Sequence, residues 1–160
     1  MNRGSTNFLK IAVIFLGIPI LALCIFVLPI LVKDAAESNS EFAYILYSIV
    51  FVMYASAIPY FVALYQAFKL LSYIDKHKAF SEISVKTIKN IKFCAITISG
   101  FYVIALPFFF IFAELDDAPG VILIGMLFIF APMVIAVFAA VLQKLLQEAI
   151  TIKSENDLTV

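Results

Sequence analysis

The densest group of carboxylates in the sequence lies in one short segment that ends in a Pro-Gly turn. Glu114, Asp116 and Asp117 fall within four residues. Acids this close together could hold Ca²⁺ or Mg²⁺ if backbone carbonyl oxygens completed the ligand shell. Their spacing matches no calcium-loop pattern, and a solvated acidic turn explains the same residues. We keep them as weak metal candidates and expect no other metal site and no cofactor.

His77 is the only histidine, and it could act with Asp75 or Glu82 as a general acid or base at a lipid surface. No cysteine or second histidine stands nearby to complete a zinc site, and no nucleophile accompanies these residues. The sequence also lacks a Ser/His/Asp set, HExxH, CxxC, a Walker-type loop and a dinucleotide fingerprint. We therefore expect no catalytic residues, with a lipid-interface enzyme as the weaker alternative.

The composition is that of a membrane protein. Hydrophobic residues make up 64% of the 160 residues and charged residues only 14%, against about 25% charged in soluble domains. The formal net charge is zero, which gives no reason to expect direct nucleic-acid binding. Cys24 and Cys94 both lie inside apolar runs, where they act as small hydrophobic residues rather than as a disulfide framework.

Four apolar stretches are each long enough to cross a bilayer core of about 30 Å as a helix. They cover residues 11–32, 42–68, 93–112 and 121–142. The first is longer than the apolar region of a signal peptide, about 7 to 15 residues, so we expect it to be retained. The stretches predict one all-α domain over residues 1–160, an integral membrane four-helix bundle of antiparallel up-down hairpins. Helices two, three and four should extend into the cytoplasm through a connector at 69–92 and a tail at 143–160.

Lysine and arginine determine the predicted orientation. With the N-terminus in the cytoplasm, ten of the 11 basic residues lie inside and only Lys33 lies outside. The sequence therefore predicts a multi-pass protein of the bacterial cytoplasmic (inner) membrane with both termini cytoplasmic.

The connector should turn near residues 75–80 and then start helix three. Ser81 is a typical N-cap residue, and Glu82 would lie favourably at the positive end of the helix dipole. Lys86, Lys89 and Lys92 form a basic stripe that could contact anionic lipid headgroups. Anchoring of the topology explains the stripe equally well.

The polar tail could form a cytoplasmic cap together with the connector. Helix four should continue past Leu142, dock on the extensions of helices two and three, and end near Ser154, with Leu158 folding back. The candidate residues for binding a protein partner are Phe80, Ser81, Glu155, Asn156 and Asp157. Helix capping and helix ending explain the same residues without a partner.

Tyrosines recur along the second apolar stretch at positions 47, 54, 60 and 65. They could line a polar pathway through the membrane, or they could serve packing and interfacial anchoring.

The chain resembles the YoaS-like family of small four-span bacterial membrane proteins, which is a domain of unknown function. The resemblance rests on the four spans, on KAFSEIS at 78–84 and on AITIKSENDLTV at 149–160. Its most specific features are the Phe80-Ser81 turn and the ENDLTV ending. It implies an integral membrane protein without assigned chemistry, whose relatives are often encoded beside a small helix-turn-helix regulator. It supplies no catalytic residues.

Two functions remain open at this level. The first is a non-enzymatic protein that binds a partner through its cytoplasmic cap, in a regulatory, sensory or immunity-like role. The alternative is a channel or transporter for a small or lipid-like molecule, which could work as a homo-oligomer. A polar, water-filled cavity would favour transport, and a dry core with an exposed cytoplasmic groove would favour partner binding.

Overall fold

All regular structure in the computed structural model is helical across the residues that it describes, 3–38, 40–77 and 79–159. The elements in chain order are α1 (Arg3–Ala22), the π-helix η1 (Leu23–Val27), α2 (Leu28–Glu37), α3 (Ser40–Asp75), α4 (Glu82–Leu115) and α5 (Gly120–Thr159). Four helical segments are long and apolar enough to cross a membrane: Gly4–Glu37, Glu41–Asp75, Glu82–Leu115 and Gly120–Asn156. The predicted all-α, four-span organisation is confirmed.

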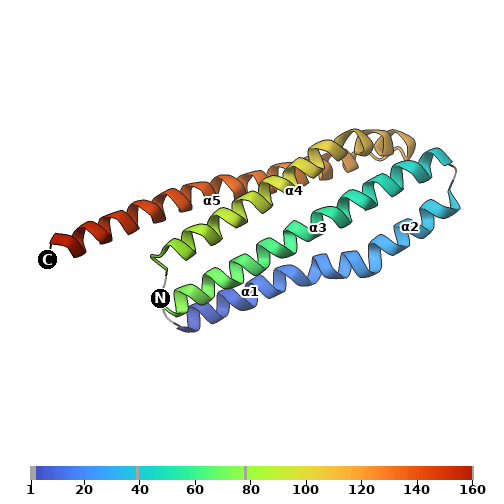
Figure 1. The fold of residues 1–160 in the computed structure, drawn as a ribbon. Helices are drawn as coiled ribbons and strands as arrows, with labels where there is room; N and C mark the ends of the chain where they lie inside the picture. The colour runs from blue at the N-terminus through green and yellow to red at the C-terminus, as the bar shows by residue number, and fades with distance from the viewer. Residues whose placement is uncertain (1–2, 39, 78, 160) are drawn as a thin grey trace.

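The helices pack in the order in which they occur in the chain. α1 and α2 pack on α3, α3 packs on α4, and α4 packs on α5, while no extensive contact joins α1 to α5 within the described residues (Figure 1). In their most apolar windows, 33% and 28% of the residues of α3 and α4 are buried, against 6% in the first segment and 11% in α5. α3 and α4 therefore form the centre of the bundle, and α1 and α5 form its two edges.

The apolar core lies between the two central helices. Ile45 and Ile49 of α3 pack with Tyr102, Ala105 and Phe109 of α4, and each of these residues is at most 7% exposed. Small residues continue this contact onto α5, because Gly125, Ala136 and Ala139 are buried there. Small residues let helix backbones approach closely, which is how helices associate where lipid removes the hydrophobic driving force.

The first membrane-capable segment changes its hydrogen-bond pattern near its middle. The backbone N–H of Leu28 donates to the carbonyl of Leu23, five residues earlier, which defines the π-helical turn η1. Pro29 follows and has no N–H to donate. The carbonyl of Cys24 thus loses both of its ordinary intrahelical donors.

The turn between α3 and α4 agrees with the sequence prediction. His77 has a left-handed backbone conformation, with φ 59°. Ser81 has the extended backbone of an N-cap, and its carbonyl accepts a hydrogen bond from the N–H of Val85 at 3.2 Å. α4 begins at Glu82, 11 residues before the predicted third span.

The prediction for the end of the tail was wrong. α5 does not end near Ser154 but continues to Thr159. The side chain of Leu158 is 84% exposed, which shows that it does not fold back onto the other helices. Figure 1 shows the last turns of α5 projecting past the other helices. Residues with a high helix propensity, such as Glu148 and Lys153, favour continuation of the helix through the weaker helix formers that follow.

Candidate functional site

A groove lies among the four helical segments that could cross a membrane. Its volume is about 420 Å³, and all four helical segments contribute to its wall, for example Ile20 of α1, Ala63 of α3, Ile98 of α4 and Ile135 of α5. Small-molecule sites in proteins have volumes of roughly 300 to 1,000 Å³. Because α1 and α5 do not pack on each other, they leave the groove between them, over a floor formed by α3 and α4.

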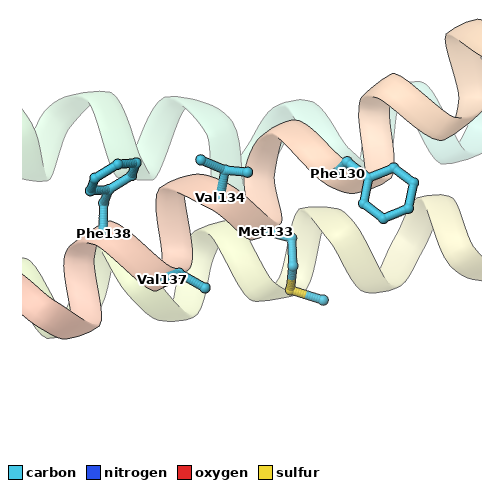
Figure 2. A pocket seen from close by; sticks show the side chains of 5 residues that line it. All are labelled: Phe130, Met133, Val134, Val137 and Phe138. Atoms are coloured by element: carbon cyan, nitrogen blue, oxygen red, sulfur yellow. The ribbon is translucent and has the colours of Figure 1, made fainter.

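A second hollow lies on the surface of α5 alone. Its volume is about 210 Å³, and its five lining residues are Phe130, Met133, Val134, Val137 and Phe138. Figure 2 shows these side chains spread along a single helix, with no polar atom apart from the Met133 sulfur. We interpret this hollow as part of the apolar surface that α5 leaves uncovered within the chain, and not as a ligand site.

Two buried hydroxyls meet at the floor of the groove. Ser56 Oγ and Tyr102 Oη are 2.8 Å apart, and Ser56 Oγ also donates to the carbonyl of Met53 at 2.9 Å. When Ser56 donates to Met53, Tyr102 must donate to Ser56, which leaves the phenol oxygen as an acceptor. When Ser56 donates to Tyr102 instead, the phenol O–H becomes a donor. The pair can therefore offer either hydrogen-bonding role to a molecule in the groove.

The tyrosines of α3 do not form one pathway. Tyr54 Oη donates to the carbonyl of Cys24 and Tyr60 Oη to the carbonyl of Leu16, both at 2.8 Å. Tyr47 and Tyr65 are instead 44% and 60% exposed. Tyr54 and Tyr60 therefore connect α3 to the first segment. Tyr54 supplies the hydrogen-bond donor that the Cys24 carbonyl lacks inside its own helix.

Replacing Tyr54 with phenylalanine should lower the free energy of unfolding by about 0.6 to 1.7 kcal/mol, the range measured for hydrogen bonds between membrane helices. The change leaves the Cys24 carbonyl without its cross-helix donor while keeping the aromatic ring. The measurement is the loss of helical circular dichroism as SDS is added to mild-detergent micelles.

The matched control is Tyr47→Phe, because Tyr47 lies on the same helix and none of its contacts within the described structure is a hydrogen bond. It should change the unfolding free energy by less than about 0.5 kcal/mol. Equal effects of the two substitutions would refute the role of Tyr54.

An ion pair that the sequence analysis missed joins α1 to α3. Lys10 Nζ lies 2.9 Å from Asp75 Oδ2, and the two side chains are 21% and 16% exposed. The same ammonium group lies 5.5 Å from the centroid of the Phe68 ring. The partners are 65 residues apart in the chain, so only the register of the α1/α3 hairpin could have revealed the pair.

The residues of the predicted cap lie on separate elements. Phe80, 56% exposed, and Ser81 lie in the turn before α4, whereas Glu155 and Asn156 are exposed on the projecting end of α5 (Figure 1). The side chain of Asp157 lies outside the described part of the structure. The fold therefore gathers Phe80 and Ser81 but does not place the α5 residues beside them.

The basic stripe divides into two kinds of lysine. Lys86 and Lys89 are exposed, while Lys92 is half-buried and donates to Gln143 Oε1 of α5 at 3.2 Å. Lys92 Nζ also lies 5.1 Å from the centroid of the Phe93 ring. Lys92 thus has a structural role between α4 and α5, and Lys86 and Lys89 remain candidates for headgroup contact.

The three acidic residues around the turn before α5 do not come together as a group of potential metal ligands. Glu114 lies in the last turn of α4, which ends at Leu115, and Asp116 and Asp117 follow, all three of them exposed. No three His, Cys, Asp or Glu side chains gather as potential ligands anywhere in the described ranges.

Known proteins similar to this chain share its membrane character. The uncharacterized membrane protein YoaS of Bacillus subtilis (strain 168) is 64% identical over 160 residues, which cover 100% of both chains. No solved structure matches the chain. The model of the DUF2975 family, described as a protein of unknown function, matches residues 30–160. The chain therefore belongs to the DUF2975 family of proteins of unknown function.

Proposed function

We propose that this membrane protein binds a lipid-like molecule with a single apolar chain in the groove between α1 and α5. We place it in the bacterial cytoplasmic membrane with both termini inside, and we assign it no chemical step. The observation that carries the proposal is the groove of about 420 Å³, which all four helical segments line around the Ser56–Tyr102 pair.

The position of the groove favours a ligand that comes from the bilayer. An open side between two edge helices faces lipid when the four segments span the membrane. A ligand dissolved in the bilayer can enter from that side without crossing the headgroup region. This geometry also supports a binding protein better than an aqueous channel.

The lining determines the chemistry of the ligand. The described lining residues include no Asp, Glu, Lys, Arg or His, and their hydroxyls come from Ser56, Tyr60 and Tyr102. An ion or a strongly polar solute would lose its hydration here without gaining a partner. An apolar chain that carries one hydroxyl or carbonyl group would fill the groove and bond to the Ser56–Tyr102 pair.

The test uses a long-chain fatty acid that carries a diazirine halfway along its chain. We expect photolabelling of the purified protein to concentrate on peptides that contain groove residues. Ala131→Trp should reduce this labelling at least fivefold, because Ala131 lines the groove and is exposed there, so tryptophan fills the space without disturbing the core.

Ala140→Trp is the matched control, since Ala140 is also an exposed alanine of α5 and does not line the groove. It should leave the labelling unchanged. Labelling spread over all lipid-facing surfaces and insensitive to Ala131→Trp would contradict the proposal.

Partner binding at the cytoplasmic end is a second candidate, favoured by one observation. Phe80 is 56% exposed in the turn before α4, next to exposed Ile83. Aromatic side chains of this kind often anchor protein interfaces. If Phe80→Ala removes a protein that co-purifies from native membranes and leaves the folded yield unchanged, this candidate gains support. Unchanged recovery of that protein would count against it.

A further inference from the structure

α5 carries an apolar stripe that no other described part of the chain covers. Phe138, Leu142, Leu145 and Ile152 are 65%, 55%, 56% and 65% exposed. With Ala149 they follow one another at intervals of four and three residues, which are the a and d positions of a heptad repeat. Asn156 occupies the next a position.

The stripe is separate from the face that holds α5 in the bundle. The buried residues Gly125, Ala136 and Ala139 face α4, and Leu146 and Ile150 continue that face as half-buried residues. At about 100° per residue, the stripe lies roughly 120° around the helix from this face. It is therefore available without disturbing the contact between α4 and α5.

Part of the stripe lies beyond the residues that we expect to be in lipid. Leu145, Ala149 and Ile152 follow the predicted apolar span, which ends at residue 142, and Figure 1 shows the end of α5 projecting beyond the other helices. Exposed apolar side chains in water favour burial against a partner. A lone projecting helix is also marginal in water and gains stability when a second helix covers its apolar face.

The charges beside the stripe are complementary to those of an identical helix. In this register Glu148 occupies a g position and Lys153 the following e position, and both are exposed. In a parallel two-stranded coiled coil, g of one helix faces e of the other helix five residues further on. Glu148 of each copy would therefore face Lys153 of the other. Two copies in one membrane share an orientation, so their α5 helices are parallel.

We propose that two copies of this chain associate through a parallel coiled coil of α5 from Phe138 to Asn156. The Glu148–Lys153 pairs fix its register, and Asn156 at an a position favours two strands over three. This interface does not depend on what the groove binds.

The test is disulfide crosslinking of the full-length chain in native membranes, with Cys24 and Cys94 replaced by serine. Leu145→Cys, at a d position, should form a covalent dimer on mild oxidation. Gln147→Cys, exposed on the same helix but at an f position, should form at least fivefold less. Equal crosslinking at the two positions would overturn the proposal.

Charge reversal separates a specific interface from random collision. Adding Lys153→Glu to Leu145→Cys places like charges opposite each other and should reduce the dimer at least threefold. Adding Glu148→Lys as well should restore it. Both side chains are exposed, so folding should not suffer. Crosslinking that ignores both charge changes would refute the register, and a monomeric mass for the unmodified protein in native mass spectrometry would refute the dimer.

Discussion

Replacing Gly125 with leucine is expected to lower the free energy of unfolding by about 2 kcal/mol, within the roughly 1 to 3 kcal/mol of an overpacked core. A Cβ atom at Gly125 would lie 3.2 Å from Phe109 Cδ2 and 3.5 Å from Leu106 Cδ1. Phe109 is only 5% exposed and cannot move aside without disturbing its neighbours. α5 must therefore shift away from α4. SDS titration followed by circular dichroism measures the loss.

Gly100→Leu is the control for the substitution itself. Gly100 is exposed on α4, and a Cβ atom there would meet nothing within 4 Å. Leucine has a higher helix propensity than glycine, so this variant should be as stable as the parent or slightly more stable. If Gly100→Leu and Gly125→Leu lose the same stability, close packing at Gly125 is not the cause.

Gly125→Leu should also change the shape of the groove. The Phe109 ring stacks on the Tyr102 ring at a centroid distance of 6.4 Å, and the Tyr102 ring lies 5.1 Å from the centroid of the Phe128 ring. Tyr102 and Phe128 both line the groove. A displaced Phe109 would therefore change the groove floor, and Gly125→Leu should weaken labelling by the diazirine fatty acid along with stability.

The sequence predicted the four spans well, because crossing a bilayer demands long, uncharged, helical segments. It did not predict which helices lie at the centre. In water an apolar stripe marks the packed face of a helix, but in lipid every face is apolar. Residues such as Ala105 and Gly125 were the available signal, since small side chains mark close contacts between membrane helices.

The groove and its hydroxyl pair could not be placed from sequence for a related reason. Ser56 and Tyr102 are 46 residues apart, and their meeting depends on the register between α3 and α4. In a regular α-helix Pro29 leaves the carbonyl of Ile25 without a donor, and only the π-helical turn η1 shifts that loss to the carbonyl of Cys24. That reasoning predicts an acceptor without a donor but cannot identify Tyr54 as its partner.

In the tail, residues that favour a turn do not end the helix. Ser154 and Asn156 favour turns, yet α5 continues through both. The heptad spacing from Phe138 onward was visible in the sequence, but its meaning required the structure, which leaves that face uncovered while a different face packs on α4.

Replacing Lys10 with methionine is expected to cost about 2 kcal/mol of unfolding free energy. The Lys10–Asp75 pair is mostly buried, so its loss should fall between the 0 to 1 kcal/mol of a surface pair and the roughly 3 to 5 kcal/mol of a fully buried one. Methionine keeps a long side chain of similar volume beside Phe68 and removes the charge, including its contact with the Phe68 ring. Lys33→Met, at an exposed lysine of α2, should change stability by less than about 0.5 kcal/mol.

A double-mutant cycle with Asp75→Asn isolates the pair from the other surroundings of the two side chains. Each single substitution already breaks the Lys10–Asp75 pair and the second substitution cannot break it again, so the cost of the double variant should be smaller than the sum of the single costs by about 1 to 2 kcal/mol. That coupling would mean that the ion pair holds the N-terminal part of α1 against the end of α3. Strictly additive costs would show that Lys10 and Asp75 act separately, and α1 would then depend on the hydrogen bonds of Tyr54 and Tyr60 and on apolar packing for its place at the edge of the groove.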